Sequence, residues 1–171
     1  AQIVHFDVDH SSVSKIIEAD IAVFGQVKNS LKAINSLIKK RLDEVDESNI
    51  KNWHEQIAEW RNKHGLNHEL YKDTSDKNPI LPQAVVQHIY HASKGNAFVT
   101  SDVGQHQMFT AQYYHFDEPR KWINSGGLGT MGFGLPSAMG VKLAYPEEEV
   151  ICITGEGSIQ MCIQELSTCS Q

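Results

Sequence analysis

Three polar segments of the sequence each follow an apolar run and carry residues suited to a phosphorylated ligand. The first, Gly155-Glu156-Gly157-Ser158, comes directly after the apolar residues 150–154. Glycine lets a backbone approach a ligand closely, the N–H groups of a helix start attract phosphate, and a carboxylate can bind Mg²⁺. The alternative is a glycine-rich turn in which Glu156 only caps the next helix, and this segment alone leaves both interpretations open.

The second segment, Gly127-Leu128-Gly129-Thr130-Met131-Gly132, has the G-x-G-x-x-G spacing of a dinucleotide-binding turn. That turn needs a preceding apolar strand and an acidic residue about 20 positions further on. Residues 122–126 are too polar for such a strand, and Glu156 lies too far along. Nicotinamide binding is therefore disfavoured, and close packing of a helix on a strand is the simpler alternative.

The third segment, residues 101–107 with the sequence SDVGQHQ, follows a short apolar run at 97–100. Gln105 and His106 carry hydrogen-bond donors that suit a phosphate. By itself the segment is equally compatible with an ordinary polar loop. Its interest comes from its position, because ligands bind at the carboxyl ends of strands in open α/β sheets.

The elements that must bring these segments together follow from hydrophobic periodicity. Apolar runs predict strands at 2–9, 20–24, 97–100 and 150–154, with a poor strand at 122–124. Apolar residues at helical spacing predict helices at 11–17, 27–42, 50–64, 82–90, 135–143 and from 159 through 169. Strands alternating with helices indicate an α/β fold, made of parallel-sheet layers with helices on both faces.

The order of these elements suggests two parts. Residues 1–64 read as the end of one α/β domain, the polar and aperiodic residues 65–78 as a linker, and residues 79–171 as the first part of a second α/β domain. The first residues resemble a strand in mid-domain, and the last predicted helix has no cap. We therefore expect the chain to be part of a larger protein.

Composition narrows the possible functions. The net charge of −6 argues against a nucleic-acid surface, and no apolar run approaches the roughly 20 residues of a membrane helix. The three cysteines, Cys152, Cys162 and Cys169, include no C-x-x-C pair, and we expect reduced, buried thiols in a cytoplasmic protein. The nine histidines show no metal-ligand spacing.

Taken together, the three segments resemble the acetolactate synthase (acetohydroxyacid synthase) family of thiamine diphosphate enzymes. The matching stretches are SDVGQHQMF at 101–109, WINSGGLGTMGFGLPSAMGVKLA at 122–144 and ITGEGSIQMCIQELSTC at 153–169. They occur in the order and spacing of the family's diphosphate-binding domain. The resemblance covers nearly the whole chain after about residue 79.

The resemblance implies a role for each matching residue. The diphosphate would be contacted by Val103, Gly104, Gln105 and His106 and lined by Gly157 and Ser158. Gly129 and Met131 would meet the aminopyrimidine, with the Met131 side chain beneath the cofactor. Glu156 takes the position of the Mg²⁺ ligand, where the family usually has aspartate. The activating glutamate of the family lies in a domain outside this sequence, so no catalytic residue is assigned.

Residues 1–64 are similar to the tail of the family's middle, FAD-binding domain. The match places Asp7 and Val8 near the adenosine of FAD, and Gln26 and Val27 near its adenine. The family usually has an acidic residue where this chain has Gln26. This part of the resemblance rests on fewer residues than the matches after residue 79.

The resemblance implies that the complete enzyme condenses pyruvate with a second 2-keto acid, with loss of CO2, in branched-chain amino-acid biosynthesis. A homodimer or larger assembly is implied, with a possible regulatory small subunit. We expect the isolated chain to be inactive. Two alternatives remain: another thiamine diphosphate-dependent decarboxylase or carboligase, and a non-catalytic fragment with a role in structure or assembly.

Overall fold

The computed structural model describes residues 2–64 and 79–171, and it divides into two compact units. The first unit ends at Ala58 and the second begins at Glu59, so the division falls inside helix α2 (Glu47–His64). The linker predicted at 65–78 lies outside the described residues. Each unit is an α/β structure with a parallel sheet, as the sequence predicted.

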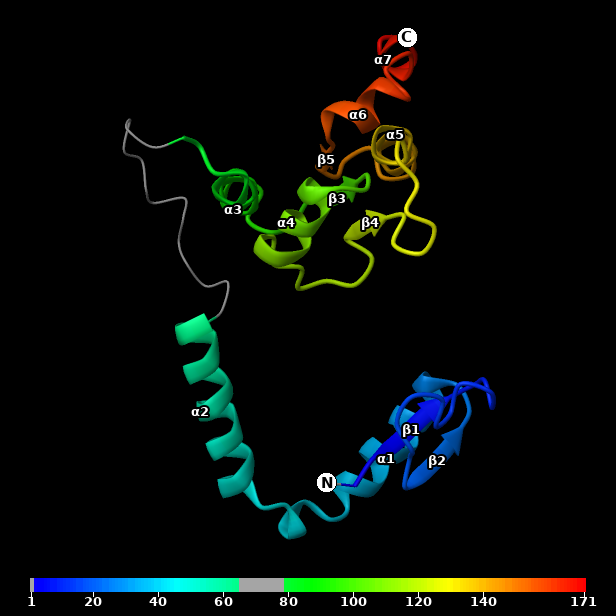
Figure 1. Cartoon of the computed structure of the whole chain (residues 1–171), viewed down its shortest axis with the longest axis vertical. Helices are drawn as coiled ribbons and strands as arrows, with labels where there is room; N and C mark the ends of the chain where they lie inside the picture. The colour runs from blue at the N-terminus through cyan, green and yellow to red at the C-terminus, as the bar shows by residue number, and fades with distance from the viewer. Residues whose placement is uncertain (1, 65–78) are drawn as a thin grey trace. The chain divides into compact units, whose positions relative to one another are not determined.

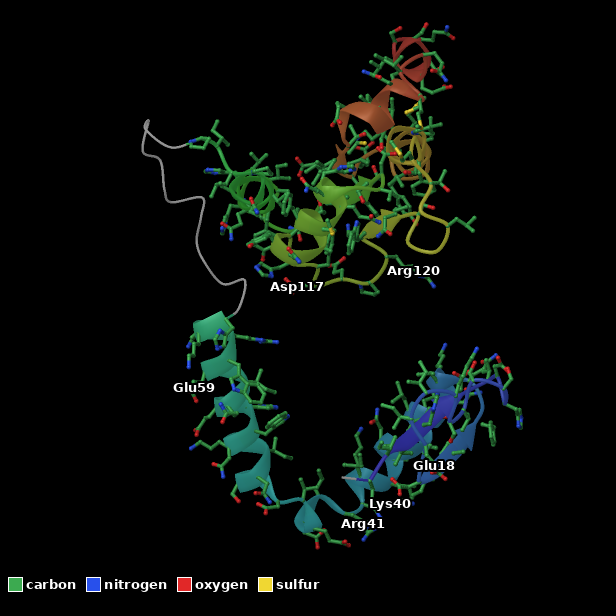
Figure 2. All side chains as sticks on the ribbon, viewed as in Figure 1. Glu18, Lys40, Arg41, Glu59, Asp117 and Arg120 are labelled. Atoms are coloured by element: carbon green, nitrogen blue, oxygen red, sulfur yellow. The ribbon has the colours of Figure 1, made fainter. Side chains whose placement is uncertain are left out.

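The first unit contains a two-stranded parallel sheet of β1 (Val4–Asp7) and β2 (Ile21–Phe24), with Val4 opposite Ile21 (Figure 1). Helix α1 (Val27–Lys39) contacts β1, and a 3-10 turn, η1 (Leu42–Glu44), leads to α2. None of the described residues from 2 to 58 is buried, and Glu18, Lys40 and Arg41, labelled in Figure 2, are among the exposed ones.

The helix predicted at 11–17 is wrong. The Asp9 carboxylate instead accepts hydrogen bonds from the Ser11 backbone N–H at 2.9 Å and from the hydroxyls of Ser11 and Ser12. Ser14 adopts a left-handed conformation with φ of 58°. Local bonds from serine and aspartate side chains compete with helix formation, and here they produce a series of turns.

The second unit contains a three-stranded parallel sheet in the order β4-β3-β5. Its strands are β3 (Phe98–Ser101), β4 (Trp122–Asn124) and β5 (Val150–Ile153). The polar segment at 122–124 does form a strand, because all three of its residues pair with β3, from Val99 opposite Trp122 to Ser101 opposite Asn124. The carboxyl ends of all three strands therefore lie at one edge of this sheet.

Five helices follow or precede these strands (Figure 1): α3 (Pro82–Ala92), α4 (Gln105–Tyr113), α5 (Gly134–Ala144), α6 (Glu156–Gln160) and α7 (Glu165–Cys169). Pro82 occupies the first turn of α3, as predicted. Helix α5 contacts β3 and β5, and α3 packs on α4. These contacts hold the loops after β3 and β5 close to the start of α5.

The single helix predicted up to residue 169 is instead two short helices. Between them the amides of Met161 and Cys162 donate to carbonyls three residues earlier, those of Ser158 and Ile159. Such bonds tighten the chain into a 3-10 turn and interrupt an α-helix. The backbone of Gly132 lies against this turn, since a Cβ built there would be 3.2 Å from Cβ of Met161.

The core of the second unit is built around Val86, Val99 and Tyr114. The Tyr114 hydroxyl bonds to Oγ of Ser93 at 2.9 Å, so the one polar atom of this buried ring has a partner. Phe116 stacks on Trp122 with ring centroids 5.2 Å apart. These ring contacts join β4 to the segment that follows α4, and they stabilise a strand that the sequence predicts only poorly.

Two further sequence predictions can be compared with the structure. The three cysteines are free, but Cys169 is exposed on α7, so the prediction that all three thiols are buried is wrong. The reason is that α7 is a separate short helix with no buried residue. Among the described residues, no helix is long and apolar enough to cross a bilayer.

Candidate cofactor site

The carboxyl edge of the second sheet opens into a cavity of about 530 Å³. Its walls come from all three segments singled out in the sequence: the turn after β3, the loop before α5 and the turn after β5. The lining residues are Pro82, Val103, Gly104, Gln105, His106, Phe109, Met131, Thr154, Gly155, Glu156, Gly157 and Ser158. The volume is in the usual range for a small-molecule site, about 300–1,000 Å³.

His106 is held between two glycines at the floor of this cavity. A Cβ built on Gly104 would lie 3.0 Å from Cε1 of His106, and one built on Gly155 would lie 2.9 Å from its Nδ1. Gly104 also has φ of 151°, a conformation that favours glycine. Both glycines are therefore needed to make room for the imidazole ring.

The Nε2 atom of His106 is buried and has no hydrogen-bond partner among the described residues. Leaving a buried polar atom unpaired is costly, and such atoms in native structures commonly mark a ligand or water position. The ring belongs to the first turn of α4, a nine-residue helix whose free N–H groups favour an anion. The site thus offers an anion a ring nitrogen and a helix N-terminus together.

Met131 reaches the cavity from the loop before α5. A Cβ built on Gly157 would lie 3.3 Å from Cε of Met131, so the end of the Met131 side chain packs against the turn after β5. Gly129, two residues earlier, is not among the lining residues. It has φ of 68° and its amide bonds to the Ser125 carbonyl at 2.9 Å, so it shapes the turn that presents Met131.

Glu156 lies in the first turn of α6 with its side chain exposed at the cavity. Within the described part of the chain, no cluster of three or more His, Cys, Asp or Glu residues could enclose a metal. Mg²⁺ often takes only one or two protein carboxylates and completes its shell with phosphate oxygens and water. The donor set here fits a metal held jointly with a phosphorylated ligand, and it does not fit a separate metal cage.

The sequence interpretation assigned no role to Asp102, which is fully buried beneath the cavity. Its Oδ1 accepts the Gly134 amide at 2.7 Å, and its Oδ2 accepts the Thr154 hydroxyl. Phe109 and Thr154 were also unassigned, yet both line the cavity. Phe109 could have been found from its spacing, because it lies three residues after His106 on one helix face.

In the first unit, the four residues matched to FAD binding gather at the carboxyl edge of the β1–β2 pair. The Gly25 amide bonds to the Asp7 carbonyl at 3.0 Å, which brings the end of β1 close to Gln26, the N-cap residue of α1. Val8 and Val27 are 63% and 53% exposed, so this edge presents an open apolar surface. The structure brings the four residues together without enclosing a ligand.

Comparison with known proteins adds independent information. Residues 102–171 match the family model of the thiamine pyrophosphate enzyme C-terminal TPP binding domain, thiamine pyrophosphate being the same compound as thiamine diphosphate. All 171 residues align at 54% identity with an acetolactate synthase large subunit of Buchnera aphidicola subsp. Schlechtendalia chinensis. They align at 50% with the acetolactate synthase isozyme 3 large subunit of Escherichia coli.

A plant relative is more distant: acetolactate synthase 1, chloroplastic, of Nicotiana tabacum is 38% identical over 168 residues. The chain spans 29% of the length of the two bacterial relatives and 24% of the tobacco one. The cavity-lining turns after β3 and β5 fall within the matched thiamine pyrophosphate domain. The chain is thus homologous to acetolactate synthase large subunits, and its residues 102–171 match the TPP binding domain of thiamine pyrophosphate enzymes.

Proposed function

We propose that the second unit supplies the diphosphate half of a thiamine diphosphate site in an acetolactate synthase catalytic subunit. The observation that carries the proposal is the single cavity in which eight of the nine residues matched to the cofactor and its metal converge, all except Gly129. They come from three stretches separated by up to about 50 residues in the sequence. Convergence at a carboxyl sheet edge is what a ligand site in this fold class requires.

The chain's own residues suggest how the cofactor would be held. The α4 N-terminus and Nε2 of His106 would bind the diphosphate, Gly104 and Gly155 would allow its close approach, and Met131 would lie against the cofactor rings. Glu156 would bind Mg²⁺ together with phosphate oxygens. The cofactor, when bound, supplies the electron sink for decarboxylation.

The reaction of the whole enzyme is proposed from its relatives. The complete subunit would condense pyruvate with a second 2-keto acid, work as a homodimer or larger in the cytoplasm, and pair with a regulatory small subunit. None of the chain's residues at the cavity is placed as a catalytic acid or base, so we expect no synthase activity from the isolated chain. The edge formed by Asp7, Val8, Gln26 and Val27 is proposed to contact the adenosine half of FAD.

Calorimetric titration of the chain with thiamine diphosphate, with and without Mg²⁺, tests the main proposal. We expect binding that requires Mg²⁺, because the Glu156 carboxylate and the diphosphate are both negatively charged and the cation would be held between them. Glu156→Gln should weaken the Mg²⁺-dependent binding at least about tenfold, since a neutral amide is a much weaker ligand for this cation. Absence of binding by the unsubstituted chain at millimolar cofactor would refute the proposal.

A specific observation also favours the assembly alternative for the first unit. The large apolar side chains there are at least partly exposed, among them Ile16 at 93%, Val8 at 63% and Leu42 at 61%. This many exposed large apolar side chains in one unit is consistent with a surface that a partner covers. Co-expression of the chain with the remaining parts of an acetolactate synthase large subunit should give a soluble complex, and failure to co-purify would argue against this role.

A further inference from the structure

The buried Asp102 carboxylate connects three elements that form the cavity. It follows the last residue of β3, it accepts the amide of the first residue of α5, Gly134, and it accepts the hydroxyl of Thr154 just after β5. The Thr100 hydroxyl adds a bond to the Gly134 carbonyl at 2.9 Å. Both carboxylate oxygens are therefore used, and each bond joins Asp102 to a different element.

The fit around this carboxylate is tight. A Cβ built on Gly134 would lie 2.7 Å from Oδ2 of Asp102 and 3.1 Å from its backbone nitrogen. Any other residue at position 134 would put its Cβ atom too close to the Asp102 carboxylate, so the start of α5 requires glycine there. The group is fully buried, and it does not line the cavity itself.

Thr154 is the link between Asp102 and the ligand site. It lines the cavity and is followed directly by Gly155, Glu156, Gly157 and Ser158. The hydrogen bond from the Thr154 hydroxyl to Asp102 fixes the position of the backbone at the start of residues 155–158. The same aspartate thereby sets the turn after β5 against the start of α5.

We propose that Asp102 is a positioning residue: through Thr154 and Gly134 it holds the Gly155–Ser158 turn in register with the loop that carries Met131. The consequence for cofactor binding rests on the proposed function. The tether itself belongs to the folded chain and can be measured without a ligand.

The test compares three variants of the whole chain. Thr154→Val keeps the side-chain shape and removes the hydroxyl that binds Asp102. Asp102→Asn keeps an acceptor for the Gly134 amide and can donate to Oγ1 of Thr154, so it should preserve the tether. Ser93→Ala is the matched control, because it removes a buried hydroxyl in the same unit that bonds Tyr114 and does not line the cavity.

The first readout is amide hydrogen exchange in the cofactor-free chain. The Ile159 amide donates to the Gly155 carbonyl at 3.0 Å and reports on the turn, while the Tyr114 amide, which donates to Thr110, reports on the core. Thr154→Val should speed exchange at Ile159 about tenfold relative to Tyr114, as expected for loss of one buried hydrogen bond. Asp102→Asn should change this ratio less than about threefold, and Ser93→Ala should not raise it.

The second readout is calorimetric affinity for thiamine diphosphate with Mg²⁺, which Thr154→Val should weaken and Ser93→Ala should leave unchanged. An unchanged Ile159 to Tyr114 exchange ratio in Thr154→Val would overturn the tether. If Thr154→Val raises the exchange ratio but the unsubstituted chain binds no cofactor, the tether is supported and the proposed function is contradicted. If Thr154→Val raises the exchange ratio but leaves the affinity for thiamine diphosphate unchanged, the inferred role of Asp102 in cofactor binding is overturned.

Discussion

Replacing Gly134 with alanine is the sharpest test of the packing described around Asp102. The added methyl group would collide with a buried carboxylate at 2.7 Å and with its Cγ at 3.0 Å. The carboxylate cannot easily move aside, because Asp102 is fully buried and both of its oxygens accept hydrogen bonds. Relief of the clash must therefore move α5 or break the bond from the Gly134 amide.

The expected cost follows from these contacts. Overpacking a tight site costs about 1–3 kcal/mol, and disturbing a hydrogen bond to a buried acceptor costs about 1–3 kcal/mol. Alanine in a helix recovers about 0.5–1 kcal/mol relative to glycine. The net effect should be a loss of about 1–5 kcal/mol in the free energy of unfolding of the second unit.

Gly140→Ala in the same helix is the matched control. A Cβ at Gly140 would meet nothing within 4 Å, so this substitution should stabilise the unit by about 0.5–1 kcal/mol. The two substitutions are chemically identical and differ only in surroundings, so their opposite signs test the structure directly.

Urea unfolding monitored by Trp122 fluorescence measures both variants. The chain has three tryptophans, and a Trp53→Phe, Trp60→Phe background leaves only Trp122, which stacks on Phe116 in the second unit. The midpoint for Gly134→Ala should fall by about 1 M urea or more. Equal midpoints for Gly134→Ala and Gly140→Ala would refute the inferred contact between Asp102 and α5.

Two further predictions concern the cavity and the thiols. Gly155→Ala should weaken thiamine diphosphate binding at least about tenfold in calorimetry, because its Cβ would displace the His106 ring, whereas Gly127→Ala, with nothing within 4 Å, should bind normally. Burial raises the pKa of the Cys152 thiol, with a smaller contribution from a nearby carboxylate. Iodoacetamide should therefore label exposed Cys169 before partly buried Cys152. Because the pKa of Cys152 is raised in the folded chain, its contribution to stability should be complete below the ordinary thiol pKa and lost as the pH rises through the raised pKa; equal labelling rates at pH 8 would contradict the partial burial of Cys152.

Much of the fold could be predicted because its signals are local. Continuous apolar runs gave β3 and β5, and the start of α3 followed from Pro82. The failures also have local causes that a periodicity count omits. Side-chain bonds to Asp9 replaced the helix at 11–17, and i→i+3 bonds after Ser158 divided the last helix.

Most of the cavity-lining residues could be predicted from the sequence, but some of the residues that complete the cavity could not. His106, Glu156 and Met131 could be named because each belongs to a stretch whose residue types suit a cofactor. Phe109 and Thr154 were missed, since an aromatic on a helix and a threonine after a strand are ordinary residues in sequence. Only their positions at the carboxyl edge of the sheet give them a part in the cavity.

The sequence by itself determined the class of fold, the resemblance to thiamine diphosphate enzymes and the residues that we propose to hold a diphosphate and its metal, because these depend on residue type and short spacing. Tertiary structure alone decided that Gly129 shapes a turn outside the cavity, that the His106 Nε2 is buried without a partner, and that Asp102 joins three elements. The last of these features arises from contacts across 32 and 52 residues of sequence, from Asp102 to Gly134 and to Thr154, and no local pattern encodes such a contact.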